Sequence, residues 1–480
     1  MLVNILLPNE NSPGMAFVYS YTFVIRTPMR IHFIAIGGSA MHNMAIAMKL
    51  KGHQVTGSDD EINEPSRSRL AKHGLLPAQM GWNPAVITAD IDEVILGMHA
   101  RADNPELVRA KELGLRIYSY PEYLYEQSKD KTRVVIGGSH GKTTITAMTL
   151  HVLKHCGIDA DYMVGAQLEG FETMVKVTPE AKFIVLEGDE YLASPVDRRP
   201  KFHLYHPHIA LLSGIAWDHI NVFPTFDNYV EQFRIFVNLI QQNGVLAYCE
   251  TDEVLRSVAE GARNDLSKQP YGVPPHEIVD GTTYLLRDDV RIPLLIFGDH
   301  NLMNSEGARR LCKAMGVTDA QFDEAIQSFK GAARRLELVR KSGTFNCYKD
   351  FAHSPSKLKA TTAAVKKQFP KRKLVACMEL HTFSSLTKEF LEQYAGAMNE
   401  ADEAYVYFNP HTIAHKKLPP ITEAQVKSAF AREDLNVSTD SSQLVKALQQ
   451  KHWDNSVLLL MTSGNFDGVD FAQLAESLVM

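Results

Sequence analysis

The sequence has few cysteines and no excess of basic charge. Its five cysteines, in 480 residues, never fall at C-x-x-C spacing, which argues against a zinc knuckle or a disulfide framework and favours reduced thiols in a cytoplasmic protein. The formal net charge is −6, so no overall basic field attracts nucleic acid, and we expect no such partner. No apolar run reaches the roughly 20 residues of a membrane span, so we expect no membrane insertion.

The first 28 residues lack the pattern of a cleaved signal peptide. They contain apolar patches but neither a basic n-region nor a convincing cleavage site. A natural first strand begins only with MRIHFIAIGG, at Met29. We therefore interpret the preceding residues either as an extension or as the result of a mis-assigned start.

What the sequence does contain is the balance of a globular protein. Hydrophobic residues make up 45% and charged residues 22% of a chain that is long enough for two to four domains. Three times along the chain, a β-rich apolar run is followed by glycines. Strands that alternate with helices in this way predict parallel α/β domains. We predict three domains, over residues 30–127, 128–328 and 329–480.

The stretch GGSHGKTT, at residues 137–144, follows an apolar run and precedes a helical pattern. A helix N-terminus attracts anions, glycines let the backbone approach phosphate, Lys142 adds a positive charge and Thr143 can ligate Mg²⁺. Ile136 stands where the usual pattern G-x-x-x-x-G-K-[ST] has its first glycine. The alternatives are a nucleotide site with a shortened loop and a chance Gly-Lys-Thr at the start of a helix.

Acidic residues follow two later predicted strands. FIVLEGDEY places Glu187 at a strand end, and IAWDHI places Asp218 and His219 at another. An acid at the carboxyl end of such a strand faces the crevice in which α/β proteins bind ligands. A solvated acidic turn and an N-cap aspartate beside an ordinary histidine are the structural alternatives.

A glycine pair opens the first predicted domain. The dinucleotide pattern G-x-G-x-x-G would fall on Ala35, Gly37 and Ala40, so only its middle glycine is present. Asp59 follows Gly37 by 22 residues, about where a Rossmann acid holds a ribose. This pattern supports a nucleotide diphosphate more than it supports NAD.

Polar clusters also occur around the predicted boundary near residue 329. An arginine there could pair with surface acids or bind phosphate through its two-pronged guanidinium. The clusters are His300, Asn301 and Asn304 in FGDHNLMNSEGA, Arg334 and Arg335 in FKGAARRLELV, and Asp350 and His353 in YKDFAHSP.

These motifs, in this order, resemble the Mur ligase family of peptidoglycan synthesis over nearly the whole chain from about residue 30. The short loop is similar to the family's G-[TS]-x-G-K-T-T. The matching stretches are Gly138–Thr144 for that loop, Glu187–Glu190 for E-[AG]-D-E, Asp218–His219 for D-H, His300–Asn304 for H-N-x-x-N, Arg334–Glu337 for R-R-x-E and Asp350–Pro355 for D-[YF]-[AG]-H-x-P.

The resemblance implies an α/β fold with three domains: a Rossmann-like N-terminal UDP-binding domain, a central P-loop ATPase-like domain with a mainly parallel sheet, and a Rossmann-like C-terminal domain. It implies an ATP- and Mg²⁺-dependent ligase that joins a carboxylate to an amine through an acyl phosphate and forms ADP and phosphate. The carboxylate substrate would be UDP-N-acetylmuramate. The insert between Tyr191 and Pro207 favours the recycled murein tripeptide L-alanyl-γ-D-glutamyl-meso-diaminopimelate as the amine, and L-alanine is the alternative.

By the same resemblance, residues of all three domains receive roles. Lys142, Glu187, His219 and Arg335 would be catalytic, with Thr143, Glu187 and His219 as metal ligands. The nucleotide would contact Gly138, Ser139, His140, Gly141, Lys142, Thr143, Thr144, His300, Asn301, Asn304, Arg335 and Asp350. The UDP site would be lined by Gly37, Gly38, Ser39, Ser58 and Asp59, and His353 would be a further substrate-binding residue.

Three other functions are rivals to this hypothesis. They are a NAD-dependent oxidoreductase built on the first domain, a non-catalytic nucleotide sensor, and a folylpolyglutamate-type ligase that shares the central fold. We expect small-molecule substrates and a monomer or weak homo-oligomer in the cytoplasm.

Overall fold

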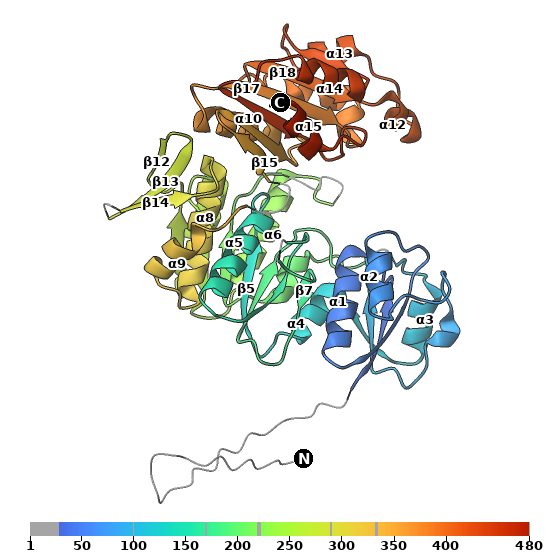
Figure 1. Ribbon diagram of the computed structural model, residues 1–480. Coiled ribbons are helices and arrows are strands. Elements are labelled where there is room, and N and C mark those ends of the chain that lie inside the picture. Colours follow the sequence, from blue (N-terminus) through green and yellow to red (C-terminus); the bar gives the residue numbers. More distant parts are fainter. Residues whose placement is uncertain are drawn as a thin grey trace, which may run out of the picture. The chain divides into compact units, whose positions relative to one another are not determined.

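The computed structural model describes residues 28–98, 100–168, 170–217, 222–288, 290–331 and 335–479. The described residues form two compact units (Figure 1). The first comprises the residues up to Tyr123 together with Ala193–Arg198, and the second comprises Leu124–Leu192 and the residues from Arg199 onward. None of the described helices is long and apolar enough to cross a membrane. All five cysteines are free thiols, as predicted.

The first unit contains a parallel sheet with the strand order β2-β1-β3-β4. The predicted first strand is confirmed, but it ends at Ile34 because Ala35 turns the backbone with a φ of 66°. The unit's elements are β1 (Arg30–Ile34), α1 (Ser39–Leu50), β2 (Gln54–Ser58), α2 (Ser66–Lys72), β3 (Glu93–Leu96), α3 (Pro105–Glu112) and β4 (Arg116–Ser119).

The border between the units falls within α4 (Tyr120–Glu126), after Tyr123. The second unit contains a seven-stranded sheet with the order β11-β10-β9-β5-β8-β6-β7. All neighbouring strands of this sheet are parallel except β6 and β7. Its elements are β5 (Thr132–Gly137), α5 (Lys142–His155), β6 (Ala160–Met163), β7 (Val175–Lys176), β8 (Phe183–Glu187), β9 (Ile209–Leu212), α6 (Phe226–Asn238), β10 (Val245–Cys249), α7 (Glu253–Glu260) and β11 (Ser267–Tyr271).

A small antiparallel sheet and two helices follow the seven-stranded sheet. α8 packs beside α5 and over the sheet, where a Cβ on Gly307 would lie 3.0 Å from Leu211 Cδ1 (Figure 1). The close approach of helix and strand therefore depends on glycine at this position. The elements are β12 (His276–Val279), β13 (Thr282–Arg287), β14 (Val290–Leu294), α8 (Asp299–Ala314) and α9 (Asp319–Ile326).

The C-terminal part of the second unit contains a third large sheet, with the order β15-β16-β20-β17-β18-β19. Only β15 is antiparallel to its neighbour. The main elements are β15 (Glu337–Ser342), β16 (Phe345–Asp350), α10 (Pro355–Gln368), β17 (Lys373–Leu380), β18 (Glu403–Phe408), α12 (Pro410–His415), α13 (Glu423–Ala429), β19 (Asn436–Ser438), α14 (Ser441–Gln449), β20 (Ser456–Met461) and α15 (Phe471–Ser477).

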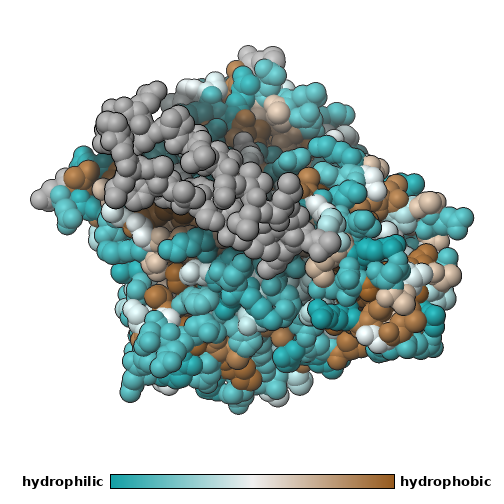
Figure 2. Space-filling view, turned by 90° about the horizontal axis from the view of Figure 1, so that it is seen from below, coloured by the Kyte–Doolittle hydropathy of each residue, from teal (hydrophilic) through white to brown (hydrophobic). Residues whose placement is uncertain are grey.

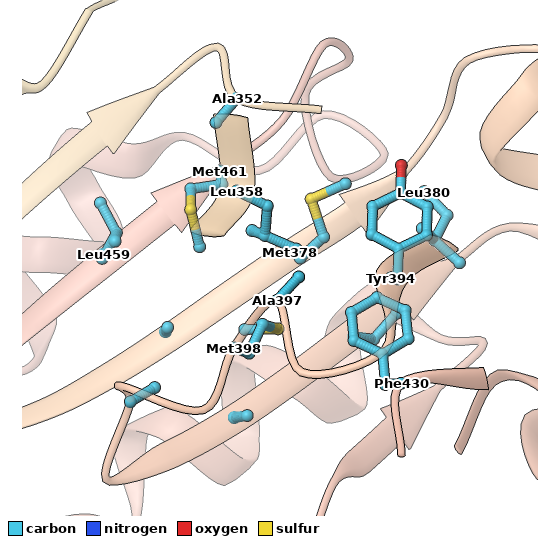
Figure 3. Close-up of a cluster of buried hydrophobic side chains, with 14 of the residues drawn as sticks. Ala352, Leu358, Met378, Leu380, Tyr394, Ala397, Met398, Phe430, Leu459 and Met461 are labelled. Atoms are coloured by element: carbon cyan, nitrogen blue, oxygen red, sulfur yellow. The ribbon is translucent and has the colours of Figure 1, made fainter. Parts of the chain in front are cut away.

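The three larger sheets carry buried apolar side chains. In the C-terminal sheet, Met378 and Met461 from neighbouring strands meet Leu358 of α10, and the rings of Tyr394 and Phe430 stack 5.0 Å apart (Figure 3). Burial of such side chains stabilises each sheet by about 25 cal/mol per Å² of apolar area. The face shown in Figure 2 is mostly hydrophilic and has separate, smaller hydrophobic patches. The predicted α/β fold is confirmed, whereas the boundaries near residues 128 and 329 stay predictions.

Candidate active site

A glycine turn joins β5 to α5 and forms the predicted phosphate loop. Gly138 (φ 115°) and Gly141 (φ 81°) have left-handed backbone conformations that favour glycine. A Cβ on Gly138 would lie 2.7 Å from the backbone nitrogen of Ser213, and one on Gly141 would collide with Asn304 Oδ1. No side chain caps the N-terminus of α5, so its amides remain available to an anion. The loop thus has the backbone shape that phosphate binding requires.

The Lys142 ammonium is the cation of this loop, and its acceptors in the protein are a backbone carbonyl and a carboxylate. It donates to the Gly138 carbonyl at 2.7 Å and to the two Glu190 carboxylate oxygens at 2.8 and 3.1 Å. Burial by itself would lower the pKa of Lys142, but the nearby carboxylates, Glu190 first, outweigh burial and raise that pKa. Lys142 is therefore charged, as phosphate binding demands.

Thr143 and Glu187 bring a hydroxyl and a carboxylate together beside the loop. The Thr143 hydroxyl donates to Glu187 Oε1 at 2.8 Å, and the Gly165 amide donates to Glu187 Oε2 at 2.8 Å. Burial raises the pKa of Glu187, and these two donors oppose that rise. The neighbouring Thr144 is buried in the first turn of α5. Hard oxygen ligands of this kind suit Mg²⁺, so Thr143 and Glu187 fit a magnesium ion that accompanies a nucleotide.

The third predicted metal ligand, His219, lies outside the described residues, as does Asp218. Within the described ranges, no three His, Cys, Asp or Glu side chains come together as a metal cage. The role of His219 stays a prediction.

The loop after β9 braces the phosphate loop. The Ser139 amide donates to the Gly214 carbonyl at 3.0 Å, and the Ser139 hydroxyl donates to the Ala216 carbonyl at 2.8 Å. The Ser213 hydroxyl donates to the His140 carbonyl. Ser139 and His140 therefore hold the two loops together, and their predicted contacts with nucleotide stay predictions.

The insert that follows the acidic strand end is anchored beside the phosphate loop. The Lys201 ammonium donates to Asp189 Oδ2 at 2.6 Å, and Leu192 pairs with Pro200 in an isolated bridge. These contacts close the base of the insert. The stretch from Leu192 to Pro200 is therefore closed at its base, and Lys201, the residue after it, is tied to Asp189.

The N-terminal turn of α8 approaches the phosphate loop from another element. Asn304 lies against Gly141, which places an amide side chain at the predicted nucleotide site. Asn301 is buried, and its side-chain amide donates to the Phe297 carbonyl at 2.9 Å. The structure thus brings Asn304 to the loop, whereas contact between Asn301 and adenine stays a prediction.

Arg335 lies among aromatic and histidine side chains. Its guanidinium carbon is 5.5 Å from the centroid of the Phe351 ring, and that ring lies 5.0 Å from the His353 ring. Burial lowers the pKa of both His300 and His353, and the charge of Arg335 lowers each further. The positive charge of Arg335 therefore acts on His300 and His353, two other residues of the predicted site. Arg334 lies outside the described residues.

Asp350 organises the backbone around this cluster. Its carboxylate accepts from the Leu336 amide at 2.7 Å and from the Ala352 amide at 2.6 Å. Burial raises the pKa of Asp350, while those amides and Arg335 oppose the rise. In this structure Asp350 fixes the segments that carry Arg335 and His353, and its predicted contact with a ribose stays a prediction.

The predicted UDP residues gather at the carboxyl ends of β1 and β2 in the first unit. The Gly37 amide donates to Asp59 Oδ2 at 2.6 Å, and burial raises the pKa of Asp59 to about 6. The Ser58 carbonyl accepts two amides of the turn at 2.9 and 3.1 Å. Gly38 precedes the uncapped N-terminus of α1, where Ser39 is exposed. This turn has the geometry to approach a diphosphate or a ribose.

Sequence reasoning missed the roles of two acids. Glu190 is the partner of Lys142, although the motif E-[AG]-D-E contains it. Asp252 caps α7 and also accepts the Ile215 amide at 2.6 Å, which fixes the loop after β9. A cap signal before a helix reveals the first function of Asp252, but no sequence spacing reveals the second.

Three family models match successive parts of the chain. They are described as "Mur ligase family, catalytic domain" over residues 30–132, "Mur ligase middle domain" over 136–309 and "Mur ligase, glutamate ligase domain" over 334–464. Together they cover most of the three sheets and include the glycine turns of both units. This agrees with the order of motifs in the sequence.

Individual relatives divide between two amine substrates. A UDP-N-acetylmuramate–L-alanyl-γ-D-glutamyl-meso-2,6-diaminoheptandioate ligase of Escherichia coli is 28% identical over 92% of this chain and 96% of its own length. A UDP-N-acetylmuramate–L-alanine ligase of Caldicellulosiruptor saccharolyticus is 31% identical over 78% and 83%.

Solved structures that match the chain include both kinds of ligase. A murein peptide ligase of Psychrobacter arcticus matches with a TM-score of 0.60 at 22% identity, over 94% of this chain and 98% of that one. A UDP-N-acetylmuramate–alanine ligase of Thermotoga maritima matches with a TM-score of 0.65 at 21% identity, over the same shares of the two chains. At such identities the structural matches show the fold alone.

Proposed function

The chain belongs to the Mur ligase family, and we propose that this ATP-dependent ligase joins UDP-N-acetylmuramate to the tripeptide L-alanyl-γ-D-glutamyl-meso-diaminopimelate. The observation that carries the ligase chemistry is the cluster of Lys142, Thr143 and Glu187 at the ends of β5 and β8. The tripeptide is supported by the anchored insert Tyr191–Pro207 and by similarity to the E. coli ligase along nearly the whole chain.

Activation of the carboxylate is the first chemical problem. A carboxylate resists attack by an amine because of its charge and resonance. An oxygen of the muramate carboxylate therefore attacks the γ-phosphorus of ATP, the bond to the bridging oxygen breaks, and ADP leaves. The acyl phosphate has a good leaving group, so the α-amine of the peptide attacks its carbonyl carbon. The tetrahedral intermediate then loses phosphate and a proton to give the amide.

Both steps concentrate negative charge, so the site must supply positive charge and hydrogen-bond donors. Lys142 and the free amides of α5 would hold the phosphates, and Arg335 would neutralise charge on the transferred group. A bound Mg²⁺ ion would supply Lewis-acid charge, and Thr143 and Glu187, with His219, would hold it. Exclusion of water from the acyl phosphate would protect it from hydrolysis.

Recognition of the UDP-sugar falls to the first unit in this proposal. The turn at Gly37 and Gly38 leaves the α1 N-terminus open to a diphosphate, and Asp59 would accept from a ribose hydroxyl. Ser58 holds the turn through its carbonyl, and Ser39 is exposed at the helix start. His353 would contact the incoming peptide from the C-terminal sheet.

L-Alanine is the second candidate for the amine. It is favoured by the 31% identity of the Caldicellulosiruptor relative, whose name gives L-alanine as its amine substrate. The two candidates share every step of the chemistry and differ only in the group that meets the acyl phosphate.

A phosphate-release assay with UDP-N-acetylmuramate, ATP and Mg²⁺ tests the proposal. The tripeptide should raise kcat/KM for phosphate release at least tenfold above the value with L-alanine, which corresponds to about 1.4 kcal/mol of discrimination. Faster turnover with L-alanine would assign the chain to the second candidate. Phosphate release that needs neither amine would instead indicate a plain ATPase.

A further inference from the structure

Glu190 is a buried carboxylate whose two oxygens both face Lys142. Its side chain is 1% exposed, and its oxygens accept from the Lys142 ammonium at 2.8 and 3.1 Å. Among the charged groups around Glu190, Lys142 does most to oppose the effect of burial on the pKa of that carboxyl. The neighbouring acid Asp189 has its own cation, Lys201, at 2.6 Å. The pairing of Lys142 with Glu190 is therefore specific.

This pairing already compensates the charge of the ammonium. The Gly138 carbonyl accepts from Lys142, and both oxygens of the Glu190 carboxylate lie on one side of the ammonium and accept from it. A phosphate group can therefore gain the full charge of Lys142 only if Glu190 gives way. The Gly138 carbonyl is part of the β5–α5 turn, whose backbone is fixed by contacts with Ser213 and Gly214. The Glu190 side chain is the acceptor that can be exchanged.

Resting on the proposed ATP site, we infer that Glu190 is a built-in competitor of the nucleotide: its carboxylate holds Lys142 until a phosphate group displaces it. Glu190 is thus a positioning residue that keeps the phosphate-binding lysine charged and in place in the empty site. The exchange lowers nucleotide affinity, because an ion-pair hydrogen bond must be given up before the phosphate gains one.

The exchange also links nucleotide binding to a divalent cation. A buried carboxylate that loses its cation carries a desolvation cost. Glu187 is close enough to Lys142 to raise the pKa of that lysine, so the released charge of Glu190 would add to that of Glu187. A divalent cation that arrives with the phosphates would offset that charge. Competition from Glu190 should therefore weaken the binding of metal-free nucleotide more than the binding of nucleotide with a divalent cation.

The test compares the dissociation constants of ADP and a non-hydrolysable ATP analogue for the full chain and its Glu190→Gln variant. Calorimetry with Mg²⁺ and with EDTA gives each constant. We expect Glu190→Gln to bind ADP about tenfold more tightly in EDTA, with a smaller gain in Mg²⁺, because a neutral amide holds the ammonium less strongly. Damage to the fold would weaken binding, so the expected change has the opposite sign to that of misfolding.

Asp189→Asn is the matched control, because it removes one negative charge near Lys142 without removing a hydrogen bond to that lysine. General repulsion of phosphate would tighten binding equally in both variants and would overturn the inference, as would unchanged or weaker binding in Glu190→Gln. Unchanged affinity for UDP-N-acetylmuramate checks that the variants fold. If the wild type binds no adenine nucleotide at all, the proposed ATP site fails instead, so the two failures are distinguishable.

Discussion

Two turns of this chain join a buried strand to a helix through glycines, and they differ in the charges around them. The turn after β1 closes on a single acid, since the Gly37 amide donates to Asp59 at 2.6 Å. The turn after β5 has a cation of its own, Lys142, which faces buried carboxylates from β8 and the residues after it. The comparison shows that glycines determine where a backbone can approach a ligand, whereas the surrounding charges determine what chemistry follows.

The largest expected effect is the loss of the cation from the second turn. Lys142→Ala should lower kcat for phosphate release by at least about a hundredfold, because one preorganised charge at a developing anion contributes that much in other enzymes. Affinity for UDP-N-acetylmuramate should not change, since Lys142 lies in the other unit. Steady-state kinetics and calorimetry measure the two quantities.

Lys201→Ala is the control for that substitution. It also removes one lysine charge close to the acidic strand end, but Lys201 pairs with Asp189 and not with the glycine turn. Turnover should fall far less than in Lys142→Ala. Equal losses in the two variants would mean that the turn itself has no special role, and the contrast between the two turns would fail.

Exchange of glycine for alanine should weaken the binding of a different ligand at each of the two turns. A Cβ at position 141 would meet Asn304 at a left-handed φ of 81°, and one at position 37 would lie 2.9 Å from Asp59 Oδ2. Gly141→Ala should therefore weaken ADP binding about tenfold or more and spare the UDP-sugar, and Gly37→Ala should do the reverse.

A third glycine supplies the reference for backbone strain alone. Gly157, just after α5, has a φ of 69°, and a Cβ added at this position would meet nothing within 4 Å. Gly157→Ala should lower stability by roughly 1 kcal/mol and leave both affinities unchanged. If Gly141→Ala, like Gly157→Ala, changes stability but not the affinity for ADP, the second turn does not act by bringing its backbone close to the ligand.

The sequence predicted the central parallel strands well because they are short apolar runs buried between helices. β8 (FIVLE) and β20 (SVLLLM) show this pattern without interruption. It did not predict β11 (SKQPY) or β12 (HEIV), whose polar residues and proline give neither an apolar run nor clear alternation. These strands form because they add to an edge or pair in a hairpin, and such pairing is a tertiary effect.

The candidate site divides along similar lines. Gly138, Gly141, Lys142 and Thr143 could be predicted because the phosphate loop is continuous in the sequence. The bond from Lys142 to Glu190 joins residues 48 positions apart, and it depends on the order of β5 and β8 in the sheet. A spacing in one sequence does not reveal that order, so the partner of the lysine could only be found in the folded chain.

The smallest expected effect concerns the acid of the first turn. Burial raises the pKa of Asp59 to about 6 from an ordinary 3.8, so between these pH values the folded chain binds a proton that the unfolded chain has released. Stability should therefore fall as pH rises through this window. Asp59→Asn should remove that fall, so its thermal midpoint should drop less between pH 4 and pH 6 than that of the wild type. Asp60→Asn should reduce the slope without removing it, because Asp60 adds to the rise in the pKa of Asp59 that burial begins. An equal fall of the thermal midpoint in Asp59→Asn and the wild type would mean that Asp59 is charged in the folded chain throughout this pH range. The first turn would then resemble the second, because both would carry a buried charge.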